Sequence, residues 1–116
     1  MVTQGTRRIP RAYSLYSKEA ASLLGRLIRL HRIERRMPTK DLADRAGISR
    51  TTLRKIESGD MKCEIGLVFE VAALVGVPLF ANTSQSPHDL REHIEAKIAL
   101  LPQSVRLGSG DVHDDF

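Results

Sequence analysis

Residues 39–60 read TKDLADRAGISRTTLRKIESGD, and this stretch decides the fold. Its first part predicts a short helix that follows Pro38 and ends at Gly47, because glycine takes the left-handed backbone of a tight turn at least strain. A second short helix is predicted to begin after Ser49 as its N-cap and to stop at the turn of residues 58–60. The stretch therefore predicts two short helices joined by a tight turn.

The spacing of four small or apolar residues indicates how these two helices pack. Ala43 lies four residues before Gly47, where two helices that cross near a right angle require a small side chain. Leu53 and Ile56 follow that glycine by six and nine residues, so they share the inner face of the second helix. This spacing is typical of a helix-turn-helix.

The predicted outer face of the second helix is polar and cationic. A DNA major groove admits one α-helix, whose N-terminal side chains reach the base edges. We therefore predict that Arg50 binds guanine O6 and N7, that Thr51 contacts a base or a thymine methyl, and that Lys55 reaches a base or a phosphate. The predicted phosphate contacts, which fix register without reading sequence, are Thr39, Lys40, Thr52 and Arg54.

The charged pair Arg54 and Lys55 could instead be solvated without any contact to DNA, because charged side chains on an exposed helix usually are. The four packing positions in register, together with a strongly basic half-chain around them, favour DNA contact. Residues 1–62 hold 15 Lys and Arg against 6 Asp and Glu, whereas residues 63–116 hold 3 against 8. Although chance could produce this asymmetry, it suits a chain with one surface for a polyanion and another for a different partner.

The composition favours one small all-α domain. The chain has 116 residues, 41% of them hydrophobic, with three Phe, two Tyr and no Trp, so its core must come from Leu, Ile, Val and Ala. No run of about 18 apolar residues exists, and no apolar segment follows the basic start, so we expect neither a membrane span nor a secretory signal. The single Cys63 cannot form an internal disulfide, which agrees with a cytoplasmic location.

The chain is predicted to begin with an arm that precedes the helical domain. Residues 1–16 read as a flexible basic arm, and residues 17–82 as the helix-turn-helix domain. The first helix of that domain is expected to start at Ser17 as N-cap. Its cationic residues fall largely on the side opposite the apolar stripe, and these are Lys18, Arg26, Arg29, Arg32 and Arg36.

Three further segments follow the two short helices. The helix over residues 64–75 is apolar almost all round, so it is expected to be the buried centre of the domain. Residues 83–101 predict a C-terminal helix with Ser86 as cap, and its apolar stripe comprises Leu90, Ile94, Ile98 and Leu101. Residues 102–116 predict a disordered acidic tail.

Residues 77–81, VPLFA, predict a brief strand. A lone strand leaves backbone groups unpaired, so a second copy of the chain would have to pair with it. Val77, Leu79 and Phe80 are the predicted dimerisation residues. The alternative is an extended segment that plugs the core with Leu79 and Phe80.

These motifs also resemble those of a known family of helix-turn-helix domains. Residues 23–80 resemble the Cro/C1-type, lambda-repressor-like helix-turn-helix domain of the Xre family, which implies a five-helix fold with base contacts from Arg50, Thr51 and Lys55. The chain departs from the family pattern at Pro38 and Thr39, where Thr and Gln are usual.

A narrower resemblance is carried by EIGLVFEVAALVGVPLF (residues 64–80), the helix after it and the acidic tail ending DDF. These segments are similar to the HipB antitoxin branch. That resemblance implies a homodimer that pairs a short strand across its two-fold axis, binds a palindromic operator, represses its own operon and holds a HipA-type Ser/Thr kinase toxin inactive. The tail residues Asp114, Asp115 and Phe116 would then bind the partner, unless the tail is only solubilising.

Other functional classes fit the sequence less well. The four histidines His31, His88, His93 and His113 are scattered, and neither a phosphate-cradling loop nor a nucleophile elbow occurs, so we expect no enzyme, no metal and no cofactor. Two alternatives within binding proteins remain. One is a stand-alone Xre-family repressor without a toxin partner, and the other is an adaptor that has lost DNA contact, which the basic recognition face opposes.

Overall fold

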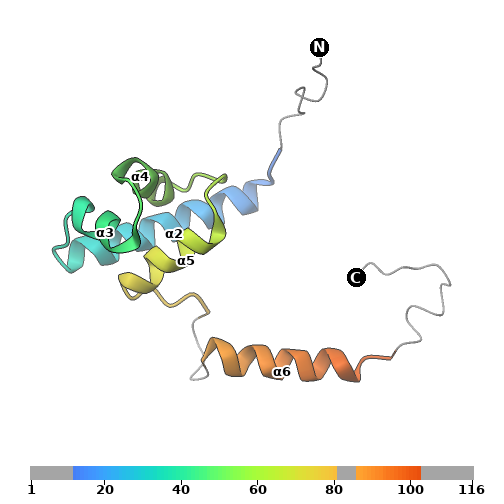
Figure 1. The fold of residues 1–116 in the computed structure, drawn as a ribbon. Coiled ribbons are helices and arrows are strands. Elements are labelled where there is room, and N and C mark those ends of the chain that lie inside the picture. Colours follow the sequence, from blue (N-terminus) through green and yellow to red (C-terminus); the bar gives the residue numbers. More distant parts are fainter. Residues whose placement is uncertain (1–11, 81–85, 103–116) are drawn as a thin grey trace, which may run out of the picture. The chain divides into compact units, whose positions relative to one another are not determined.

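The computed structural model describes residues 12–80 and 86–102. Within these ranges the helices are α2 (Leu15–Glu34), α3 (Thr39–Ala46), α4 (Arg50–Ser58), α5 (Ile65–Leu74) and α6 (Pro87–Leu100) (Figure 1). The same ranges contain no strand. The chain divides into two compact units, residues 1–79 and 80–116. The prediction of an all-α protein is therefore confirmed for the described residues.

Helix α2 begins earlier than predicted. The Ser14 hydroxyl oxygen accepts a hydrogen bond from the Ser17 backbone N–H at 3.2 Å, so Ser14 is the N-cap. The prediction of Ser17 as cap is wrong, and Leu15 and Tyr16, assigned to the basic arm, are helical. Both serines can satisfy a first-turn N–H, and the earlier one captures an additional turn of helix.

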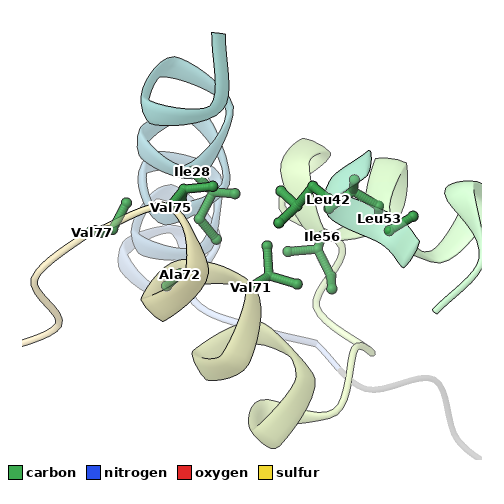
Figure 2. Packing of buried hydrophobic residues seen from close by; sticks show 9 residues of the cluster. Ile28, Leu42, Leu53, Ile56, Val71, Ala72, Val75 and Val77 are labelled. Atoms are coloured by element: carbon green, nitrogen blue, oxygen red, sulfur yellow. The ribbon is translucent and has the colours of Figure 1, made fainter. Parts of the chain in front are cut away.

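Four helices contribute to one hydrophobic core, shown in Figure 2. Three residues predicted to face inward, Ala43, Leu53 and Ile56, are at most 3% exposed. Burial of each large aliphatic side chain stabilises the fold by roughly 1.5–3 kcal/mol. The remaining fully buried apolar residues are Ile28, Leu42, Val71, Ala72, Val75 and Val77.

Helix α5 is not buried all round, contrary to the prediction. Val71 and Ala72 lie in the core, but Ile65 is 67% exposed and Phe69 is 38% exposed. The helix packs against α3. A domain of this size has neighbouring helices on only one side of α5, so the opposite side of an apolar helix faces outward.

The predicted dimerisation strand is absent from residues 77–80, and residue 81 lies outside the described residues. Val77 is 5% exposed, and its N–H donates a hydrogen bond to the Ala72 carbonyl at 2.9 Å. Its side chain therefore belongs to the core of its own domain and is not free for a second copy. Leu79 also packs against that core, whereas Phe80 is 62% exposed. The plug interpretation holds for Leu79 but not for Phe80.

The second unit contains α6. Its N-cap is Ser86, whose hydroxyl oxygen accepts from the Asp89 N–H at 3.1 Å, and Pro87 is the first helical residue, as predicted. Ile94 and Ile98 of the predicted apolar stripe are exposed. Residues 83–85, the basic residues 1–11 and the tail residues Asp114, Asp115 and Phe116 lie outside the described residues. Among the described helices, none has the length and apolar character needed to cross a bilayer.

Gly25 allows α2 and α4 to approach closely. A Cβ atom at this position would lie 2.6 Å from the carbonyl oxygens of both Ile56 and Glu57. Because those atoms are backbone, they cannot move aside without shifting α4. We expect Gly25→Ala to lower the free energy of unfolding by about 1–3 kcal/mol, although alanine is the better helix former.

The matched control is Gly66→Ala in α5, where an added Cβ meets nothing within 4 Å. That change should raise stability by about 0.5–1 kcal/mol through helix propensity alone. Urea unfolding followed by circular dichroism measures both variants. Equal effects of the two substitutions would show that the helices do not meet at Gly25.

Candidate nucleic-acid interface

The turn between α3 and α4 has the predicted backbone. Gly47 ends α3 with φ 71°, in the left-handed region, and the next residue, Ile48, donates its N–H to the Ala43 carbonyl at 3.0 Å. Ser49 then caps α4, because its hydroxyl oxygen accepts from the Thr52 N–H at 3.0 Å. These local bonds fix where α4 starts and which side chains stand at its N-terminus.

Helix α4 separates its packing residues from its predicted DNA contacts. Leu53 and Ile56 are buried, whereas Arg50, Thr51 and Lys55 are exposed. Thr51 and Lys55 lie four positions apart and therefore share a face of α4, and Arg50, the first residue of the helix, is exposed next to them. Arg54 is also exposed and lies beside them.

Unlike Arg54, the predicted phosphate contacts Thr52 and Thr39 are half-buried. Thr52 is half-buried, and its hydroxyl oxygen accepts from the Ser49 hydroxyl at 3.0 Å. Thr39 is the half-buried first residue of α3, where Pro38 as N-cap provides no side-chain hydrogen bond. The first-turn N–H groups of α3 therefore lack the side-chain cap that Thr or Ser would supply.

Lys40 forms an ion pair on the surface of α3. Its Nζ lies 2.8 Å from Asp44 Oδ2, one helical turn away. This hydrogen bond and the carboxylate charge raise the pKa of Lys40, so the ammonium stays protonated throughout the neutral range. The pair is exposed to solvent and hence weakly held, which leaves Lys40 able to exchange Asp44 for a phosphate.

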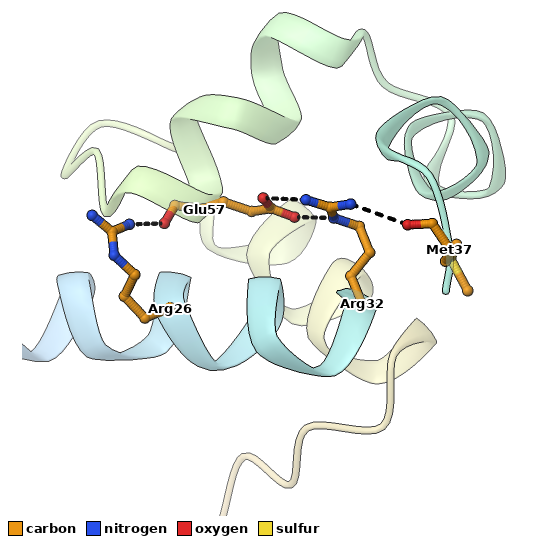
Figure 3. A network of polar contacts seen from close by, with 4 residues as sticks. All are labelled: Arg26, Arg32, Met37 and Glu57. Atoms are coloured by element: carbon orange, nitrogen blue, oxygen red, sulfur yellow. Dashed lines mark hydrogen bonds and ion pairs between the residues drawn. The ribbon is translucent and has the colours of Figure 1, made fainter. Parts of the chain in front are cut away.

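An ion pair that was not predicted from the sequence lies behind the predicted DNA-contacting surface of α4. Arg32 donates from Nε to Glu57 Oε2 at 2.7 Å and from Nη2 to Oε1 at 3.1 Å, and its Nη1 donates to the Met37 carbonyl at 3.0 Å (Figure 3). Arg26 Nη1 donates to the Glu57 backbone carbonyl at 2.7 Å. Both arginines were predicted on the side of α2 opposite its apolar stripe. Arg26 is exposed, as predicted, whereas Arg32 is half-buried, and both connect α2 to the last turn of α4.

The sequence of α4 indicates that Glu57 needs a cationic partner. Glu57 is 7% exposed, and it lies four residues after Leu53, next to Ile56. A carboxylate on the inner side of a helix requires a cation, because an unpaired buried charge is strongly unfavourable. The spacing therefore predicts a partner for Glu57, but several arginines of α2 could supply it.

Two further titratable side chains of the first unit, His31 and Cys63, are half-buried. His31 Nδ1 donates to the Val75 carbonyl at 3.1 Å, which ties α2 to the end of α5. Cys63 is half-buried; burial, followed by the nearby Asp60 carboxylate, raises the pKa of its thiol, so the reactive thiolate is suppressed. No cluster of three or more metal-ligating side chains occurs within residues 12–80 and 86–102.

Comparison with known proteins bears on the first unit. Residues 23–79 match the family model described as a helix-turn-helix domain. No match was found among curated proteins or solved structures. The matched segment spans the buried part of α2, the turn at Gly47 and the core helix α5. Residues 23–79 are therefore similar to a helix-turn-helix domain, in which α3 and α4 correspond to the paired helices.

Proposed function

We propose that this protein binds duplex DNA sequence-specifically and regulates transcription by repression. The observation that carries the proposal is the exposed surface of Arg50, Thr51 and Lys55 on a helix whose opposite side is locked into the core. A helix with its side chains is about 10–12 Å wide, which matches a major groove about 12 Å wide. A fixed helix of this kind holds its outer side chains in a constant register against base edges.

The three base-reading side chains have different chemistry. The Arg50 guanidinium provides two parallel donors for guanine O6 and N7. Thr51 offers a hydroxyl and a methyl group, and Lys55 offers a flexible ammonium that reaches a base or a phosphate. Thr39, Lys40, Thr52 and Arg54 surround these residues as proposed phosphate contacts.

Arg50→Ala is expected to weaken specific binding by about 1–3 kcal/mol and to relax selectivity at one base position. The reason is loss of the bidentate guanine contact, since no hydrogen bond of the Arg50 side chain within the described ranges would be broken. Fluorescence anisotropy with duplexes from the region upstream of the gene, at two salt concentrations, measures the effect.

The control for that measurement is Arg35→Ala, which removes an exposed arginine from the end of α2. It should change affinity for the upstream duplex much less than Arg50→Ala does. An unchanged footprint for the Arg50 variant would reject the assignment of the base-reading face. Wild-type protein without DNA affinity, or with affinity independent of salt, would reject the proposed function.

We further propose a homodimer on a palindromic operator, with the two α4 helices about one DNA turn, roughly 34 Å, apart. Exposed large apolar side chains support association: Ile65 and Phe69 in α5, and Phe80 before α6. Val77 is not part of this proposal because it is buried in its own domain.

The finer proposal is an antitoxin that represses its own operon and neutralises a HipA-type Ser/Thr kinase toxin. It rests on the resemblance of residues 64–80 and of the acidic tail to the HipB branch. The alternative is a stand-alone repressor. The reading frame next to this gene separates the two, because an antitoxin requires a kinase-like chain encoded beside it, whereas a stand-alone repressor does not.

A further inference from the structure

A cleft of about 330 Å³ opens between α2 and α4, beside the start of α3. Four arginines dominate its lining, three from α2 and one from α4, and only one acidic residue accompanies them. The lining residues are Arg26, Arg29, Arg32, Thr39, Arg54, Glu57 and Ser58.

The single carboxylate in the cleft, that of Glu57, is already paired with an arginine. Both oxygens of Glu57 accept hydrogen bonds from Arg32, and its backbone carbonyl accepts from Arg26. Arg29 and Arg54 are exposed and make no hydrogen bond or ion pair within residues 12–80 and 86–102. Four guanidinium groups against one carboxylate leave a strong positive excess, which an anion in the cleft would neutralise.

The cleft lies beside the proposed recognition surface. Arg54 follows Arg50 by one turn of α4, and Thr39 begins α3, so both connect the cleft to the DNA-facing side of the domain. A helix seated in the major groove has phosphates along both of its flanks. The flank of α4 that carries Arg54 also borders Arg26 and Arg29 of α2.

We propose that this cleft binds a backbone phosphate of the DNA, with Arg29 of α2 as a contact additional to Arg54. This inference rests on the proposed function. A guanidinium matches the oxygens of a phosphate with two parallel donors, and the two arginines held by Glu57 keep the wall of the cleft in place. Helix α2 thus contributes directly to DNA binding as well as to the core.

The test uses the full chain, the upstream duplex and a second duplex of unrelated sequence. Arg29→Gln should weaken binding to both duplexes by the same factor. It should also reduce the slope of log affinity against log salt concentration by about 0.9, the loss expected for one phosphate contact. Arg29→Lys keeps the charge and should retain most of the wild-type slope.

The matched control is Arg35→Gln, which removes the same charge from the C-cap of the same helix. The Arg35 guanidinium lies next to Gly76, where a Cβ would meet its Nη2 at 2.5 Å, and it does not line the cleft. The control should leave the slope close to that of the wild type. Thermal unfolding of each variant establishes that it remains folded.

Three results would overturn the inference while the proposed function stands: an unchanged slope for Arg29→Gln, an equal fall for Arg35→Gln, or a loss confined to the upstream duplex. The last would make Arg29 a sequence-reading residue rather than a phosphate contact. Failure of the wild-type chain to bind either duplex would overturn both the inference and the proposed function.

Discussion

Glu57→Ala is expected to lower the free energy of unfolding by about 3–5 kcal/mol, the largest loss among the substitutions considered. The side chains of Arg32 and Glu57 are 11% and 9% exposed, so removing the carboxylate leaves a nearly buried guanidinium without its counter-ion. Small domains are stable by only about 5–15 kcal/mol, so this substitution should remove a large share of the stability of the domain. Urea unfolding followed by circular dichroism measures the loss.

The control for this experiment is Glu70→Ala, which removes an exposed carboxylate from α5 and should change stability by less than about 0.5 kcal/mol. A second variant joins Arg32→Met to Glu57→Leu. It should recover much of the lost stability, because a buried ion pair replaced as a whole by apolar side chains often costs little. If Glu57→Ala costs no more than the Glu70 control, the ion pair does not hold α2 and α4 together.

Leu53→Ala should cost about 2–5 kcal/mol, because Leu53 is fully buried and its truncation leaves a cavity under α4. The same substitution at Leu23, which is 61% exposed on α2, removes identical atoms without opening a cavity. Thermal unfolding should therefore separate the midpoints of the two variants by roughly 8 °C or more, since 1 kcal/mol shifts the midpoint of a small domain by about 4–8 °C.

The Leu53 variant also separates folding from recognition. At a temperature where it remains folded, its affinity for the upstream duplex should fall much less than that of Arg50→Ala, because Leu53 cannot reach DNA. Equal midpoints for the Leu53 and Leu23 variants would mean that Leu53 does not lie in the core.

Local chemistry made the turn and the recognition helix predictable. Gly47 and Ser49 act on backbone groups within a few residues of themselves, so their sequence context already specifies the end of α3 and the start of α4. The periodicity of Ala43, Leu53 and Ile56 likewise identifies the side of each helix that must be buried. The same logic places Arg50 on the outside without any knowledge of tertiary structure.

Longer-range features were not predictable in the same way. The partner of Glu57 is 25 residues away, and only the crossing of α2 and α4 at Gly25 selects Arg32 from a helix rich in arginine. The uniform apolar pattern of α5 gave no indication of which side would stay uncovered. Val77 illustrates a further limit, because a β-branched residue suits a strand and a core equally well until the surrounding helices are placed.

The residues of α4 that pack in the core are different from those on its exposed surface, and this separation has an evolutionary consequence. The side chains of Arg50, Thr51 and Lys55 make no hydrogen bond or ion pair within the described residues, and they take no part in the core. Under the proposed function, exchanging them changes which DNA sequence the surface recognises while leaving the free energy of unfolding nearly unchanged. Duplicated copies of such a gene can diverge toward new DNA sequences without compensating mutations elsewhere, and the same three positions are the natural choice for a library that reprograms the specificity of the domain.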